Sequence, residues 1–130
     1  MLTLFAEGQP AVCARVQATP PETLCTTIIS VQQQLDGWND CLPRAKTRAK
    51  LAGLYQKFTF TVQFLSRLRI VSFGEPAIER FEHLKKLKLN VGSMDLRIAA
   101  IVLEQDATLV TRNLRDFRRV PGLRIEDWSK

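Results

Sequence analysis

The sequence contains little cysteine or histidine, and this scarcity excludes several kinds of site. Its three cysteines, Cys13, Cys25 and Cys41, lie far apart and form no CxxC pair, which argues against a disulfide framework and a zinc knuckle. We expect them to be buried thiols. The single histidine, His83, and the lack of GxSxG, HExxH or glycine-rich phosphate-loop patterns leave a histidine triad, a zincin site or a nucleotide loop unsupported.

Long apolar runs are also missing. No stretch approaches the ~20 apolar residues of a membrane-spanning helix, and the opening MLTLFAEGQP is too short and too soon polar for a signal peptide. We therefore expect a cytoplasmic protein with no membrane association. The length of 130 residues and the 45% hydrophobic content suit one globular interior, so we expect a single domain over residues 1–130.

Positively charged residues outnumber negatively charged ones. The formal net charge is +6 and the sequence pI is about 9.7, which favours an anionic partner, either nucleic acid or an acidic protein segment. The alternative is a basic surface with no partner, and charge alone does not separate the two.

The N-terminal region predicts helices on either side of one short strand. Apolar residues broken by Gly8 and Pro10 predict a helix, a turn and a helix over residues 2–16. The segment TLCTTIIS, residues 23–30, has the β-branched content of a short buried strand.

A helix is predicted to follow over residues 31–41. Ser30 would cap it, Leu35 and Trp38 would lie on its inner face, and Pro43 would end it.

Residues 44–68 predict one or two long amphipathic helices. Their apolar residues recur at three- and four-residue steps; these are Leu51, Leu54, Tyr55, Phe58, Val62, Leu65 and Leu68. The opposite face is basic. This stripe is either part of the core, which is the commoner arrangement, or an apolar groove for a partner helix.

The C-terminal half alternates strands and helices. We expect a strand at residues 70–73, followed by a helix that starts at Pro76 and buries Ile78, Phe81, Leu84 and Leu87. A helix over 94–105 and a strand at 107–111 should come next. A turn over 112–117 then leads to a last strand at 123–125. This alternation indicates an α/β layer fold with a mainly parallel central sheet.

Two aspartates bracket the most apolar part of this half. Helix 94–105 is apolar almost all round, with Ser93 as its expected cap and Asp95 in its first turn, where an acid also complements the helix dipole. The helix rises roughly 18 Å and the following strand runs back a comparable distance. Asp95 and the segment from Thr111 to Asp116 should therefore meet at the carboxyl edge of the sheet, where open α/β folds bind ligands.

Clustered carboxylates with neighbouring amide and hydroxyl oxygens are ligands for Mg²⁺ or Mn²⁺, ions used to hydrolyse phosphodiester bonds. A basic protein with an acidic metal edge is consistent with a nuclease. The alternative is a purely structural role for both acids.

At these residues the chain resembles the PIN-domain family and, within it, the VapC-like toxins of type II toxin-antitoxin modules. The matching motifs are GSMDLRIAA (92–100) and LVTRNLRDFRRVPGL (109–123), with a weaker match in TTIISVQQQLDGW (26–38). The resemblance implies a three-layer α/β/α fold, a divalent metal site, endoribonuclease activity, a small antitoxin partner and, by default, a homodimer.

Carried over by position, the resemblance implies roles for residues of these motifs. Asp95 and Asp116 would be catalytic, metal-binding acids, and Thr111, Asn113 and Gln33 would support the site. If the chain is a ribonuclease, three neighbouring arginines would steer the RNA backbone, and the alternative is a solvated turn; these are Arg112, Arg115 and Arg119.

The sequence departs from the family pattern at two acids. The family's first strand, which ends in an aspartate, is absent, and Gln33 stands where the family has a glutamate. If Met1 is not the true start, the upstream DNA should encode that strand. Fewer carboxylates imply weaker metal binding and a weakened ribonuclease. The alternative is a catalytically inactive relative that binds an antitoxin or RNA.

Overall fold

A computed structural model describes residues 18, 20 and 23–127 of the chain. The helical segments predicted over residues 2–16, and Cys13, lie outside them. The elements are β1 (Cys25–Thr27), α2 (Ile28–Cys41), the 3₁₀ helix η3 (Leu42–Arg44), α3 (Arg48–Ser66), β2 (Arg69–Val71), α4 (Glu75–Lys86), α5 (Ser93–Glu104), β3 (Thr108–Val110), α6 (Leu114–Phe117) and β4 (Arg124–Glu126). None of these helices is long and apolar enough to cross a membrane.

The strands pair in parallel, as the alternation of strands and helices predicts. β1 pairs with β2, with Thr26 opposite Ile70, and β3 pairs with β4, with Leu109 opposite Ile125. Among the described residues these are two separate two-stranded sheets rather than one continuous sheet.

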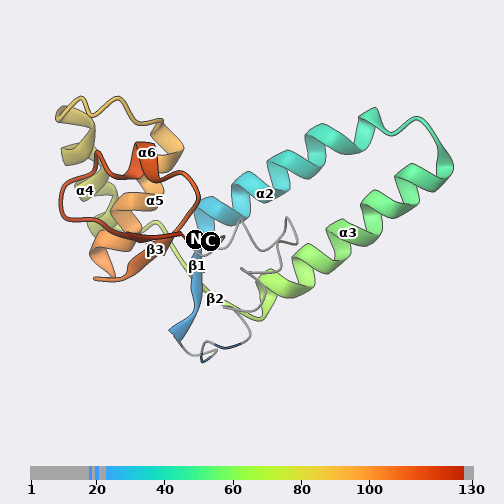
Figure 1. The fold of residues 1–130 in the computed structure, drawn as a ribbon, viewed down its shortest axis with the longest axis horizontal. Helices are drawn as coiled ribbons and strands as arrows, with labels where there is room; N and C mark the ends of the chain where they lie inside the picture. The colour runs from blue at the N-terminus through green and yellow to red at the C-terminus, as the bar shows by residue number, and fades with distance from the viewer. Residues whose placement is uncertain (1–17, 19, 21–22, 128–130) are drawn as a thin grey trace.

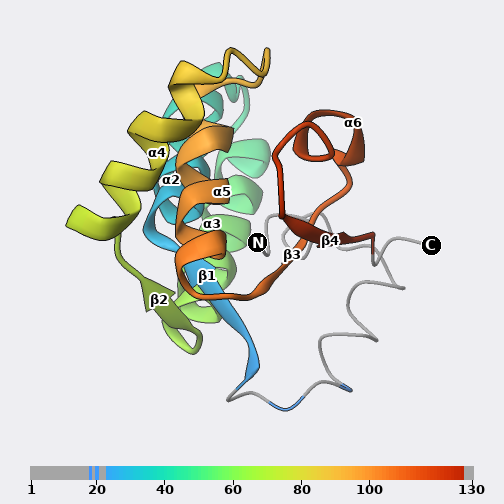
Figure 2. The same cartoon turned by 90° about the vertical axis from the view of Figure 1, so that its left-hand side faces the viewer.

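The helices divide into two groups (Figure 1). α2 and α3 form a long hairpin that projects away from the other labelled helices, whereas α4, α5 and α6 gather on the other side. α4 packs along α5, as Figure 2 shows from the side, and α5 also contacts α2 near the base of the hairpin. The base of α2 and the start of α5 are therefore brought together.

The core is built around α5. The buried side chains of the core come from six elements and the segments next to them. Helix α5 contributes Leu96, Ile98, Ala99, Ala100, Ile101 and Val102. Small residues allow α5 to approach its neighbours closely, since Ala99 and Ala100 are fully buried. The prediction of a buried, nearly all-apolar helix is confirmed.

Helix α2 begins earlier than the sequence predicts. Its N-cap is Thr27 rather than Ser30, because the Thr27 Oγ1 accepts a hydrogen bond from the Ser30 backbone N–H at 3.0 Å. Ile28 and Ile29, read as strand from their β-branched side chains, are the first helical residues. A good capping residue thus overrides a weak strand propensity.

The Thr27 cap is expected to contribute measurably to stability. Its hydroxyl is buried and also lies 3.0 Å from the Ser30 hydroxyl, so Thr27→Ala should lower the free energy of unfolding by about 1–2 kcal/mol. Thr47, the exposed cap of α3, accepts a hydrogen bond from the Lys50 N–H at 3.1 Å. Urea denaturation should show a smaller loss for Thr47→Ala, and an equal or larger loss would contradict this ranking.

Most of the apolar stripe of α3 lies outside the core, contrary to the more favoured of the two interpretations; only its C-terminal end, at Leu65 and Leu68, is buried or packs against the core. Tyr55 is 51% exposed and Val62 is 45% exposed, while only Thr61 and Leu65 of this helix are buried. The reason is the arrangement of the hairpin, in which α3 lies away from the core built around α5 (Figure 1). Trp38 of α2 is half-buried because its ring stacks on Phe58, with the centroids 5.4 Å apart.

Other predicted positions also differ. Leu35 is 39% exposed, and Leu87, which caps the C-terminus of α4, is 55% exposed. Ser93 is the first residue of α5 rather than its cap, which is Gly92. Cys25 and Cys41 are free thiols, half-buried rather than buried.

Candidate functional site

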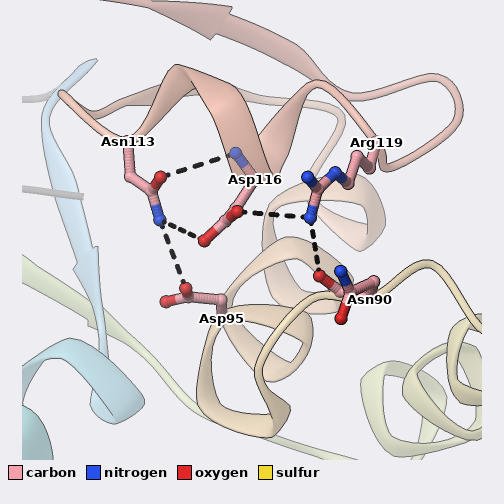
Figure 3. Close-up of polar contacts among 5 residues, drawn as sticks. All are labelled: Asn90, Asp95, Asn113, Asp116 and Arg119. Carbon is pink, nitrogen blue, oxygen red and sulfur yellow. Dashed lines mark hydrogen bonds and ion pairs between the residues drawn. The ribbon is translucent and has the colours of Figure 1, made fainter.

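The two aspartates converge as the sequence predicts. Asp95 lies in the first turn of α5, and Asp116 lies in α6, after β3 has run back along the core. Asn113 lies between them (Figure 3), and its Nδ2 donates to Asp116 Oδ2 at 3.1 Å and to Asp95 Oδ2 at 3.4 Å. One amide group therefore joins both carboxylates.

Local hydrogen bonds hold the turn that carries Asn113. The Thr111 Oγ1 accepts a hydrogen bond from the Asn113 N–H at 3.0 Å, and the Asn113 Oδ1 accepts one from the Asp116 N–H at 3.4 Å, capping α6. The amide oxygen of Asn113 thus stabilises the short helix. Its nitrogen is left to face the acids.

A pocket of about 140 Å³ opens beside Asp95. Its polar lining comes from three parts of the chain: Ser30 and Gln33 of α2, Asp95 of α5, and Thr111 and Asn113 after β3. Its apolar lining is Ile98, Leu109, Val110 and Phe117. The predicted supporting residues Gln33, Thr111 and Asn113 are therefore all brought to Asp95.

The environment raises the pKa of Asp95 above its ordinary value. The larger cause is burial, which disfavours the charged carboxylate, and the smaller is repulsion from the Asp116 carboxylate. A cation held between the two acids would relieve this repulsion.

The raised pKa predicts a pH dependence of stability in metal-free protein. An acid with a higher pKa when folded binds a proton more readily in the folded state, so this contribution to stability falls as pH rises from ~4 through the folded pKa. Asp95→Asn should remove it. Urea denaturation in EDTA at several pH values should show the variant gaining stability over the unmodified chain as pH rises, and a constant difference would contradict the assignment.

The three predicted RNA-binding arginines fall in different environments. Arg112 and Arg115 are exposed, in the turn and helix α6 that also carry Asn113 and Asp116. Arg119 is half-buried, and its Nη1 donates to the Asn90 carbonyl oxygen at 2.8 Å and lies 3.5 Å from Asp116 Oδ1 (Figure 3). Arg119 is thus engaged within the protein.

The side chains present fit a hard divalent cation. Asp95 and Asp116 supply two carboxylates and the pocket lining adds the residues Gln33, Ser30 and Thr111, all with side-chain oxygens, and Mg²⁺ keeps several waters while binding one or two carboxylates. Within the described ranges no group of three or more acidic, histidine or cysteine side chains is placed to hold a metal. Water would therefore supply much of the coordination.

Two contributions to the site were missed from the sequence. Ser30 lines the pocket one helical turn before Gln33, and the spacing of three residues on one helix face could have indicated it. The contact from Arg119 to the Asn90 carbonyl spans 29 residues, and no local pattern signals it.

Curated proteins of related sequence are nucleases. Over 71 residues the chain is 39% identical to ribonuclease VapC2 of Rickettsia felis, covering 52% of this chain and 53% of that protein. Over 109 residues it is 29% identical to the tRNA(fMet)-specific endonuclease VapC of Salmonella typhimurium, covering 81% and 75%. The chain thus spans about half the length of the first relative. No protein-family model matches it.

Solved structures share the fold over nearly the whole chain. DNA-bound VapBC from Salmonella typhimurium matches with a TM-score of 0.78 at 24% identity, covering 96% of this chain and 90% of that one. VapBC2 from Rickettsia felis, bound to a fragment of promoter DNA, matches with a TM-score of 0.75 at 25% identity, covering 98% and 93%.

Proposed function

The chain is VapC-like in sequence and has a PIN-like α/β fold, as its motifs predict, and on this premise we propose that it is a metal-dependent endoribonuclease. The observation that carries the proposal is the pair of carboxylates, Asp95 and Asp116, joined by the Asn113 amide beside a polar pocket. We propose a single domain acting on cytoplasmic RNA.

The site residues have separable tasks in this mechanism. Asp95 and Asp116 would hold Mg²⁺ or Mn²⁺, and Asn113 keeps their carboxylates convergent. When bound, such an ion supplies polarisation of a phosphate and activation of water. Arg112 and Arg115, exposed at the same edge, attract the RNA backbone.

The residue at position 33 affects how tightly the site is expected to bind a divalent ion. Gln33 lines the pocket and stands where the family pattern has a glutamate, so the site carries one less negative charge to hold a divalent ion. We propose weaker metal binding than a site with that glutamate. Gln33→Glu tests this directly, since it should lower the Mg²⁺ concentration needed for cleavage.

The first test is cleavage of a mixed RNA substrate that includes tRNA(fMet), the RNA for which the Salmonella relative is named. We expect cleavage with Mg²⁺ or Mn²⁺ and none with EDTA. A folded chain that cuts nothing with either metal would contradict the enzyme proposal, and cleavage that survives EDTA would indicate a contaminant.

A binding function has its own support. Leu51, Tyr55 and Val62 of α3 are exposed apolar side chains, and Lys50 and Lys57 on the same helix are basic, a combination that suits an acidic, amphipathic partner helix. The matched structures are of VapBC assemblies. We propose a small acidic antitoxin as partner and a homodimer as the assembly.

Binding without cleavage would favour the inactive alternative. We expect a small acidic protein to be encoded beside this chain and to bind it, and Tyr55→Ala together with Val62→Ala should weaken that binding. Tight binding by a chain that cleaves no RNA would assign it as a binding relative. Absence of binding would count against the antitoxin proposal while leaving the cleavage test intact.

A further inference from the structure

Arg119 connects two segments that carry the acid pair (Figure 3). Its Nη1 has two hydrogens, and its two acceptors lie on different parts of the chain: the Asn90 carbonyl oxygen at 2.8 Å and Asp116 Oδ1 at 3.5 Å. Asn90 belongs to the connection between α4 and α5, and Asp116 belongs to α6.

The connection held by Arg119 determines where α5 begins. Asn90 adopts a left-handed backbone with φ of +60°, a conformation that Asn tolerates better than most residues. Two residues later Gly92 caps α5, and its carbonyl accepts the first hydrogen bond of the helix, from the Leu96 N–H at 2.9 Å. Asp95 lies within that first turn, so its position depends on this connection.

We propose that Arg119 is a positioning residue that clamps the connection between α4 and α5 to α6 and so fixes the separation of Asp95 and Asp116. The clamp itself does not depend on the proposed function; only its effect on metal binding rests on that function. Arg119 acts through the two acids, and its half-buried guanidinium is directed to Asn90 and Asp116. Its exposed neighbour Arg118 provides a charge-matched control.

The positive charge of Arg119 and its positioning role have opposite consequences for metal affinity. A guanidinium beside Asp116 repels a divalent ion, so removing it would tighten metal binding if charge alone mattered. Its contact with Asp116 is partly exposed and long, at 3.5 Å with both side chains about one third exposed, so this repulsion is screened. Loss of a residue that orients metal ligands typically weakens affinity by ~10-fold or more, and we expect this effect to win.

The clamp is first tested without metal. Amide hydrogen exchange of Leu96 in EDTA reports on the first turn of α5. Arg119→Gln should accelerate it by about 5- to 10-fold, the effect of losing one partly exposed hydrogen bond of ordinary net strength. Arg118→Gln should leave it unchanged. Equal rates in all three proteins would overturn the clamp whether or not the chain is an enzyme.

The consequence is tested by Mg²⁺ titration with calorimetry. Because relief of the screened repulsion offsets part of the ~10-fold loss, Arg119→Gln should weaken Mg²⁺ binding by ~3- to 10-fold. Arg119→Lys, which keeps a charged donor, should bind Mg²⁺ more tightly than Arg119→Gln does. The reverse order would mean that the charge only repels the ion and would overturn the proposal. If the unmodified chain neither binds Mg²⁺ nor cleaves RNA, the proposed function fails, and the Leu96 exchange rates still decide the clamp.

Discussion

Asp95→Asn is expected to lower Mg²⁺-dependent RNA cleavage by at least ~100-fold. The substitution keeps the size of the side chain and an oxygen that accepts the hydrogen bond from Asn113, so it removes charge and little else. Among the described residues, Asp95 and Asp116 are the carboxylates joined at the site, and the loss of one leaves a single negative charge of this pair to attract a divalent ion. Initial cleavage rates at saturating Mg²⁺ measure the effect.

Asp106→Asn is the matched control for this prediction. Asp106 is an exposed acid that pairs with Arg124 at 3.0 Å, away from the pocket, and its left-handed backbone with φ of +50° also suits asparagine. It should cleave at the unmodified rate. Equal losses in both variants would mean that net charge, rather than the site, controls the rate.

A stability measurement tests whether a loss of cleavage in Asp95→Asn comes from misfolding. Because burial and Asp116 raise the pKa of Asp95, its charge is unfavourable in metal-free protein near neutral pH. The variant should therefore be at least as stable in EDTA as the unmodified chain. An inactive variant that remains folded would locate the loss in the chemistry of the site.

The site could be predicted because its geometry follows from helix and strand lengths. The path of α5 outward and β3 back brings Asp95 to the segment from Thr111 to Asp116 without any knowledge of side-chain packing. The position of Arg119 could not be found in this way. Its acceptor at Asn90 depends on the conformation of a connection that has no periodic pattern.

The limits of the fold prediction have a similar cause. Periodicity identified α3 as amphipathic, but it does not say what lies against an apolar stripe, and Tyr55 and Val62 are exposed. The start of α2 was misplaced because Ile28 and Ile29 have strand propensity, whereas the Thr27 hydroxyl decides the local structure. By contrast, α5 is apolar almost all round, which favours burial as its stable arrangement.

The largest expected loss of stability comes from a substitution in the buried helix α5. Ile101 is 1% exposed at the centre of the core, and Ile101→Ala should lower the free energy of unfolding by about 2–5 kcal/mol through lost burial and the cavity left behind. Leu51 of α3 is 38% exposed, and Leu51→Ala should cost less than ~1 kcal/mol. Urea denaturation of both variants measures the difference.

The comparison of Ile101 and Leu51 also separates the two roles of apolar residues in this chain. Similar losses would mean that the α3 stripe is buried in solution, which would contradict the exposed hairpin and remove support for a partner surface there. A large loss confined to Ile101→Ala would mean that the core alone holds α5, and therefore Asp95, in place. Cleavage by that variant should then fall only in proportion to its unfolded fraction, because no residue of the acid pair has changed.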